Sequence, residues 1–177
     1  NSPYRQTCAD HLNRLITDYN RTPPNPNSRT RKPTENLTDY ISFLMTTCSD
    51  AGRPDTCYQQ AASLLSFQFD FKTILASLRQ AENSPSVYAR CHELTHYLSR
   101  NEYLKTNSVP AVYLSCDSTC HGGCYHGVLE QYLKDTRLSP TADTLAQEFA
   151  QLCEQVKSDS PPLVYYECFH GMGHAAM

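Results

Sequence analysis

The sequence predicts an all-α protein of stacked helical hairpins that disulfides hold together. Apolar residues recur at helical spacing from residue 35 almost to the end of the chain, and no stretch alternates as a half-buried strand would. Ser-Pro pairs, which favour the first turn of a helix, stand where three helices would begin. Nine cysteines among the 177 residues lie mostly near predicted helix ends, as in a disulfide-stapled domain.

The chain divides at residue 34 into an N-terminal segment and a larger domain. Apolar residues at helical spacing over 7–19 predict one amphipathic helix. Residues 20–34 carry four prolines among polar side chains, and proline removes backbone donors, so we expect an exposed linker there. The helix and linker make up residues 1–34, and a helical-repeat metal-binding domain spans 35–177.

The apolar spacing within the larger domain predicts a series of helices, each with one apolar face. Gly122 and Gly123 precede a helix over 124–135, and Ser160 with Pro161 opens the last one. The residues predicted to face inward in the other helices are Leu37, Tyr40, Ile41 and Leu44; Cys57, Ala61, Leu64 and Leu65; Phe71, Ile74, Leu75 and Leu78; Val87, Cys91, Leu94 and Leu98; and Leu145, Phe149, Leu152 and Val156.

A short motif recurs at the start of successive helices. Cysteine followed closely by histidine opens the helices at Cys91, Cys124 and Cys168, and Cys57 begins an earlier copy that has glutamine instead. The first histidine of the motif recurs after 34 residues and again after 44. A period of about 34–44 residues is typical of a two-helix unit that stacks on its neighbours.

The cysteines are expected to form disulfides within these units. The expected pairs are Cys48 with Cys57, Cys153 with Cys168, and one of Cys116, Cys120 and Cys124 with Cys8 or Cys91. Nine is an odd number, so one cysteine must stay free, bind a ligand or pair with another chain. The helical pattern still runs at Met177 without a stop signal, so we expect a natural continuation that carries the missing cysteine.

Composition places the chain outside the reducing cytoplasm and excludes several partners. The cysteines, with glycosylation sequons at Asn20 and Asn36, favour a secreted, periplasmic or cell-surface glycoprotein. No apolar run is long enough for a membrane span. The formal net charge is −3 and the basic residues are scattered, so no nucleic-acid partner is indicated. Self-association or continuation in a longer chain remains open.

Three predicted helices carry a pair of metal-binding side chains four residues apart. The pairs are His92 with His96, His126 with Glu130, and His170 with His174. Side chains at this spacing share a helix face, so each pair can converge on one ion. Six donors suit a centre of two metal ions. They also suit a centre of one ion in which some of the six hydrogen-bond to the ligands and do not bind the metal themselves. His121 is a further candidate ligand.

Glycines in two of these motifs suggest that the helices approach one another closely. Gly127 and Gly171 directly follow the first histidine of their motifs. Glycine inside a helix costs roughly 0.8–1 kcal/mol relative to alanine, so its presence there needs a reason. We expect a close backbone approach at the metal site to supply it.

Residues 92–96 also match H-E-x-x-H, the zinc-peptidase motif. In that alternative the two histidines bind zinc, Glu93 is the catalytic base and Glu130 supplies the third ligand. The extended metzincin motif is absent, and no strand is predicted to hold a peptide substrate. The related motifs have glycine at the position of Glu93, which weakens the peptidase hypothesis.

Two other interpretations of these residues are a structural role and haem attachment. Duplicated helices would duplicate core histidines that merely satisfy hydrogen bonds, as in a structural or interaction module of the cell exterior. The run from Cys116 to His121 is one residue longer than the C-x-x-C-H motif of covalent haem attachment. The motif has no second copy, so we expect its cysteines to form disulfides and do not expect haem.

The spacing H-x-x-x-H and H-x-x-x-E resembles the ligand pattern of helical di-iron proteins of the hemerythrin type and of type 3 copper proteins. The resemblance covers the ligand spacing alone. It implies iron or copper with redox or oxygen chemistry, whereas zinc would imply hydrolysis or a structural role. The sequence thus predicts an exported helical protein that binds transition metal through its repeated motifs, with enzymatic and non-enzymatic functions both open.

Overall fold

The structure, a computed structural model, describes residues 36–136, 142–157 and 162–175. These residues form nine α-helices and one short 3-10 helix, η1, and contain no β-strand. The predicted all-α class is therefore confirmed, while the repeated hairpin unit stays a prediction. In chain order the elements are α2 (Leu37–Ser49), α3 (Pro54–Gln68), α4 (Phe71–Ala81), α5 (Pro85–Tyr88), α6 (Cys91–Thr106), α7 (Val109–Tyr113), η1 (Thr119–Gly122), α8 (Gly123–Thr136), α9 (Ala142–Lys157) and α10 (Pro162–Ala175).

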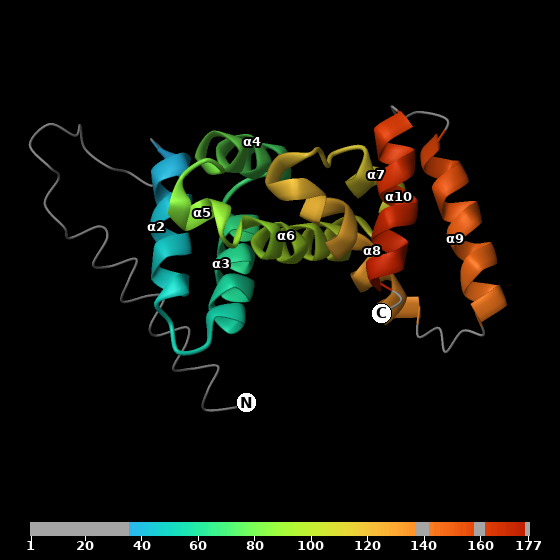
Figure 1. The fold of residues 1–177 in the computed structure, drawn as a ribbon, viewed down its shortest axis with the longest axis horizontal. Helices are drawn as coiled ribbons and strands as arrows, with labels where there is room; N and C mark the ends of the chain where they lie inside the picture. Colours follow the sequence, from blue (N-terminus) through green and yellow to red (C-terminus); the bar gives the residue numbers. More distant parts are fainter. Residues whose placement is uncertain (1–35, 137–141, 158–161, 176–177) are drawn as a thin grey trace, which may run out of the picture.

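The helices spread along the long axis of the molecule, with the first ones at one end and α9, beyond α10, at the other (Figure 1). Helices α2, α3 and α4 are at one end, α9 and α10 are at the other, and α6 and α8 lie between them. The predicted N-terminal helix and linker, together with Cys8 and Asn20, fall outside the described residues. No helix in the described part is both long enough and apolar enough to cross a membrane.

Local sequence signals set the start of the first helices. The side chain of Asn36 accepts the N–H of Asp39 at 3.2 Å and begins α2. Asp70 begins α4 in the same way. The disulfide between Cys48 and Cys57 then joins the end of α2 to the start of α3, which confirms the predicted hairpin bridge.

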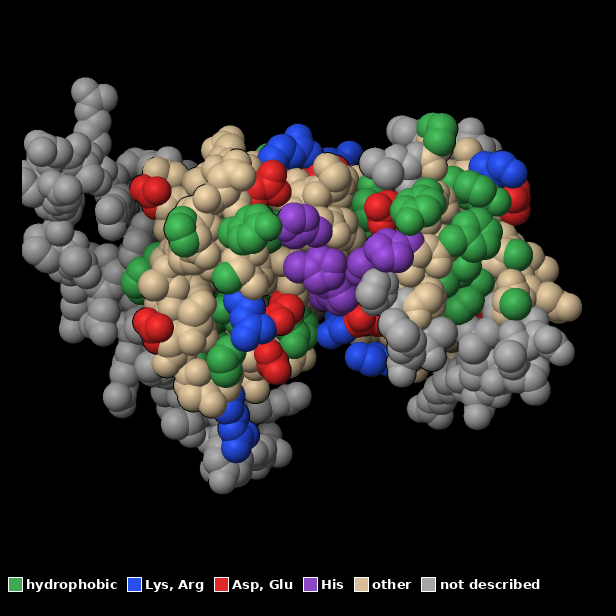
Figure 2. Space-filling model, in the orientation of Figure 1, with side chains coloured by type: hydrophobic (Ala, Val, Ile, Leu, Met, Phe, Trp, Pro, Cys, Tyr) green, Lys and Arg blue, Asp and Glu red, His purple; other side chains and the backbone are tan. Residues whose placement is uncertain are grey.

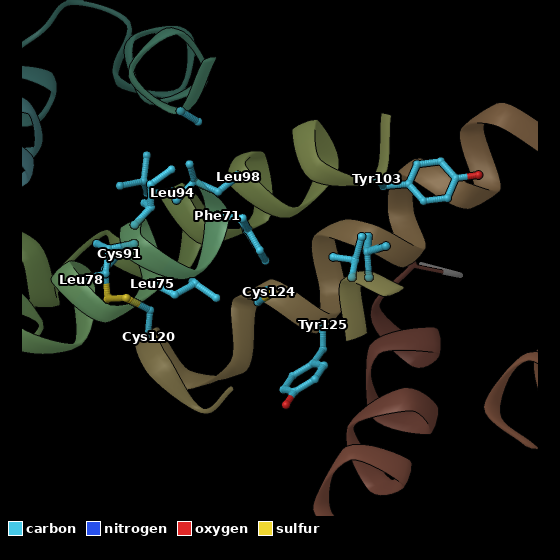
Figure 3. Packing of buried hydrophobic residues seen from close by; sticks show 14 of the residues in the cluster. Phe71, Leu75, Leu78, Cys91, Leu94, Leu98, Tyr103, Cys120, Cys124 and Tyr125 are labelled. Carbon is cyan, nitrogen blue, oxygen red and sulfur yellow. A yellow bond between two sulfur atoms is a disulfide. The ribbon is translucent and has the colours of Figure 1, made fainter. Parts of the chain in front are cut away.

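A single apolar core fills the space between α2, α3, α4 and α6. Figure 3 shows Leu94 and Leu98 of α6 close to Phe71 and Leu75 of α4. Burying a side chain of this size stabilises the fold by roughly 1.5–3 kcal/mol relative to exposure. The fully buried leucines and isoleucines of this core are Ile41, Leu44, Leu65, Ile74, Leu75, Leu78, Leu94 and Leu98.

Helices α6 and α8 approach much more closely, because small residues line their contact. Gly123 and Gly127 of α8 face Thr95 and Ser99 of α6, one turn apart on each helix. A methyl group at Gly127 would lie 2.6 Å from the Cα of His96, so only glycine fits. The expected close approach at Gly127 is confirmed.

Helix α10 packs on the opposite side of α8 and is tied to α9. A disulfide between Cys153 and Cys168 joins the two helices, as predicted. A methyl group at Gly171 would lie 3.1 Å from Leu129 and 3.3 Å from the ring of His126, so glycine brings α10 close to α8. The glycines thus place α6, α8 and α10 side by side.

The remaining two disulfides cluster at the start of α6 and α8. Cys91 pairs with Cys120, and Cys116 pairs with Cys124. The pairing of Cys91 with one of the three clustered cysteines was among the expected bridges. Four disulfides in the described residues fit an oxidising, extracytoplasmic environment.

Candidate metal centre

Four histidines gather where α6, α8 and α10 meet. His92 and His96 come from α6, His126 from α8 and His170 from α10. The ring centroids of the first three lie 4.7–5.4 Å apart, and that of His170 lies 5.0 Å from His126. Figure 2 shows histidine side chains together on one face in the middle of the molecule, while the side chain of His126 itself is buried.

His92, His96 and His126 form the first group of donors, here called the α6–α8 cluster. One ring nitrogen from each lies within 4.8 Å of the other two, and the Nε2 atoms of His92 and His96 are 3.1 Å apart. Metal–nitrogen bonds of about 2.0–2.1 Å place the donors of one ion roughly 3–3.5 Å from each other. The cluster can therefore hold a metal ion.

Acceptors orient the other ring nitrogens of the two α6 histidines. The Nδ1 of His92 lies 3.0 Å from the carbonyl oxygen of Cys120, and the Nδ1 of His96 lies 3.2 Å from a carboxylate oxygen of Glu130. Each acceptor favours the tautomer with its proton on Nδ1, which leaves the lone pair of Nε2 for a metal. Metal-binding histidines commonly have this arrangement.

Glu130, a predicted ligand, supports His96 from outside the donor cluster. Besides its contact with His96, its carboxylate pairs with Arg100, one turn further along α6. Neither group of clustered donors includes Glu130. Direct ligation by Glu130 stays a prediction, while the observed contacts place it where it orients the imidazole.

The environment of His96 keeps its imidazole neutral. Burial lowers the pKa of His96 to about 4, and the positive charge of Arg100 acts in the same direction. The carboxylate of Glu93 opposes this shift without cancelling it. A neutral imidazole is the form that binds a metal, so His96 is ready to do so well below neutral pH.

The turn before α8 has an unusual backbone that aims one acceptor at the cluster. Cys120, His121 and Gly122 have φ angles of 55°, 57° and 71°, a conformation that costs non-glycine residues roughly 1–3 kcal/mol each. Glu82 accepts the N–H of Cys120 at 3.1 Å and helps to hold this turn. The turn directs the Cys120 carbonyl oxygen toward His92.

His126, Glu167 and His170 form a second group of donors, here called the α8–α10 cluster. Their donor atoms also lie within 4.8 Å of one another, and the Nδ1 of His170 is 3.3 Å from Glu167. Glu167 was not among the ligands predicted from the sequence. The signal was nevertheless present, because Glu167 and His170 are three residues apart and share a helix face.

The other predicted site residues lie outside both clusters or outside the described side chains. Glu93, the catalytic residue of the peptidase alternative, pairs with Arg90 at 2.6 Å. His121 is exposed and meets the ring of Tyr88 edge-on, with centroids 5.5 Å apart. His174 lies in α10, but its side chain is not among those described.

The disulfides also bear on the haem motif. Cys116 and Cys120 are bonded to Cys124 and Cys91, so neither offers the thiol that covalent haem attachment requires.

Comparison of the chain with models of known protein families, with curated proteins and with solved structures finds no match. The case for a function therefore rests on the geometry of the clustered side chains.

Proposed function

We propose that this protein is an exported metalloprotein whose principal site binds one transition-metal ion through His92, His96 and His126. One observation carries the proposal: the Nε2 atoms of the α6 histidines lie 3.1 Å apart while acceptors engage both Nδ1 atoms. When both Nδ1 atoms carry the ring protons, the two Nε2 atoms face each other as lone pairs, an arrangement that a metal ion between them stabilises. Glu130 and the Cys120 carbonyl oxygen would hold the ligands in place.

The donor set supports zinc or copper at this site. Three neutral imidazoles suit both ions, and a four-coordinate ion bound by three histidines keeps one position for water or substrate. Such an ion supplies Lewis acidity or, for copper, redox chemistry. Structural zinc sites usually have four protein ligands, so a set of three histidines favours a metalloenzyme over a closed structural site.

The peptidase alternative receives less support. Its base must be available to polarise a water on the metal, whereas the Glu93 carboxylate pairs with Arg90 on the exposed side of α6. Glu130, the third ligand in that mechanism, contacts Arg100 and the far nitrogen of His96. Glu93 is a metal ligand in neither mechanism, so Glu93→Gln should leave metal affinity unchanged in both, and only loss of peptide hydrolysis in this variant would support the peptidase.

Metal titration of the disulfide-intact protein tests the proposal. After chelator treatment, calorimetric titration with Zn²⁺ should detect binding, and Co²⁺ should give the visible absorption of a low-coordinate site. His92→Ala, His96→Ala and His126→Ala should each weaken the tightest binding by about 100-fold or more, because each removes a ligand. His121→Asn is the matched control, since it removes an exposed histidine and asparagine tolerates a positive φ.

Two results would overturn the proposal. One is less than about 0.1 metal ion per chain after gentle isolation, together with no binding on titration. The other is unchanged binding in all three ligand variants, which would place any metal elsewhere in the chain.

A further inference from the structure

We infer that the α8–α10 cluster is a second cation site, so that the protein holds two metal ions which share His126. This inference rests on the proposed function, because it extends the site formed by the α6 histidines. Its own ligands are His126, Glu167 and His170. The sequence allowed a dinuclear centre on donor number alone, whereas the geometry indicates which side chains would form each half.

The donors separate into two groups and do not form one. Within the described residues, atoms that all lie within 4.8 Å of one another make two triplets, and His126 is their only common member. Ligands of a single ion lie roughly 3–3.5 Å apart at bond lengths of 2.0–2.1 Å, so five donors around one ion would appear as one group. Two triplets therefore point to two ion positions.

Helix α10 is fixed where it can offer its pair of donors to His126. The disulfide between Cys153 and Cys168 ties it to α9, and Gly171 lets its backbone come close to the ring of His126. Glu167 and His170 then project from the same side of the helix as Gly171. The second site is thus built on rigid elements, like the first.

The two sites differ in donor type and would select different ions. The α6–α8 cluster offers three neutral imidazoles, whereas the α8–α10 cluster offers two imidazoles and a carboxylate. A set of two histidines and one carboxylate suits Fe²⁺ or Mn²⁺ as well as Zn²⁺. His170 is 44% exposed and Glu167 is 18% exposed, so the second ion would keep positions open to solvent.

Sharing His126 has a chemical consequence that can be measured. One histidine can bind two ions only through both ring nitrogens, so the second ion must displace the remaining N–H proton of His126. That proton would pass to the buffer, and the two ring nitrogens of His126 would then each hold one ion. Metal–nitrogen bonds of about 2.0 Å on either side of the ring would place the ions roughly 6 Å apart.

Metal stoichiometry in the disulfide-intact chain tests the inference. Elemental analysis after loading with Zn²⁺ should give two ions per chain for the unmodified protein and one for Glu167→Gln or His170→Ala. His92→Ala should also retain one ion, held by the second site. Phe169→Ala is the matched control on α10, because Phe169 is exposed and belongs to neither cluster; it should still bind two.

Copper loading tests whether His126 is shared. An imidazolate bridge couples two Cu²⁺ ions magnetically, so the electron paramagnetic resonance intensity at low temperature should fall well below that of two isolated ions. Two bound ions that show no magnetic coupling would overturn the inference. So would a single bound ion whose affinity is unchanged or only weakened in the Glu167 and His170 variants. In both cases the α6–α8 site would stand. No ion in any variant would overturn the proposed function itself.

Discussion

Helix α6 is buried on two sides, and the two sides use opposite kinds of side chain. Leu94 and Leu98 lie in the apolar core that α6 shares with α3 and α4. On the other side Thr95 and Ser99 face the glycines of α8, and His92 and His96 lie beside this contact. Large side chains separate the helices in the core, whereas small ones let the backbones touch beside the histidine cluster.

This difference shows which contact defines the position of the ligands. An aliphatic core tolerates changes of shape, because neighbouring side chains can repack around them. A contact between backbones cannot adapt in that way, since the carbonyl groups and Cα atoms on both sides are fixed by helical hydrogen bonds. The glycine contact therefore holds His126 in a defined place relative to His92 and His96, and substitutions there should be the most damaging.

The largest expected effect is that of Gly127→Ala. The added methyl group would overlap the backbone of His96 and the hydroxyl of Ser99, and the His96 backbone cannot move without shifting α6. We expect a loss of about 4 kcal/mol or more in the free energy of unfolding, in the range where single substitutions are diagnostic of a specific mechanism. Chemical denaturation of the metal-free protein measures it.

Gly173→Ala is the matched control for that substitution. Gly173 lies in α10, two residues beyond Gly171, and a methyl group there would have no neighbour within 4 Å. Alanine is the better helix former by roughly 0.8–1 kcal/mol, so this variant should be slightly more stable than the unmodified protein. Equal destabilisation by both variants would mean that the α6–α8 contact is not the sensitive one.

Much of the fold follows from local patterns that a single sequence displays. The inward faces of the helices were predicted because apolar spacing reports burial directly. The bridges Cys48–Cys57 and Cys153–Cys168 were predicted because each joins neighbouring helices across a short connection. The glycine after His126 indicated a close approach, since its cost in helix propensity has to be offset by packing.

Only the pairs of donors that lie on a single helix could be predicted from the sequence. The spacing of His92 and His96 brought them together correctly, but a repeated motif could not show that Glu130 meets Arg100 and His96. Spacing along a helix does not determine which neighbouring helix a carboxylate will face. The position of Glu167 beside His126 and His170 was missed for a related reason, because the prediction used the repeated four-residue spacing and Glu167 and His170 are three residues apart.

Acid should cause the next largest loss of stability, and on the histidine side of α6 it should act through His96. The pKa of His96 is about 4 in the folded protein and near 6.5 in an unfolded chain. Between these values the unfolded chain binds a proton that the folded protein does not, so stability falls as the pH is lowered from 6.5 to 4. At 1.36 kcal/mol per pKa unit, the loss reaches about 3 kcal/mol.

Urea denaturation of the metal-free protein at pH 7, 5.5 and 4 checks this expectation. Carboxylates also titrate toward the lower end of this range, so the measurement compares the unmodified protein with His96→Gln, which has no proton to gain at this position. The decline in stability should be shallower in the variant. Identical curves for the two proteins would show that His96 does not resist protonation in the fold.

The smallest effect expected is that of Glu130→Gln, which changes the support of a ligand and leaves every ligand in place. The carboxylate orients His96 and balances the charge of Arg100. Its loss should weaken Zn²⁺ binding by about 10- to 100-fold, because the imidazole becomes less basic and an unbalanced cation remains near the metal. Calorimetric titration measures the change.

Glu102→Gln is the control, since Glu102 pairs with Lys105 on α6. Equal weakening of Zn²⁺ binding by both variants would mean that loss of negative charge anywhere on these helices explains the effect.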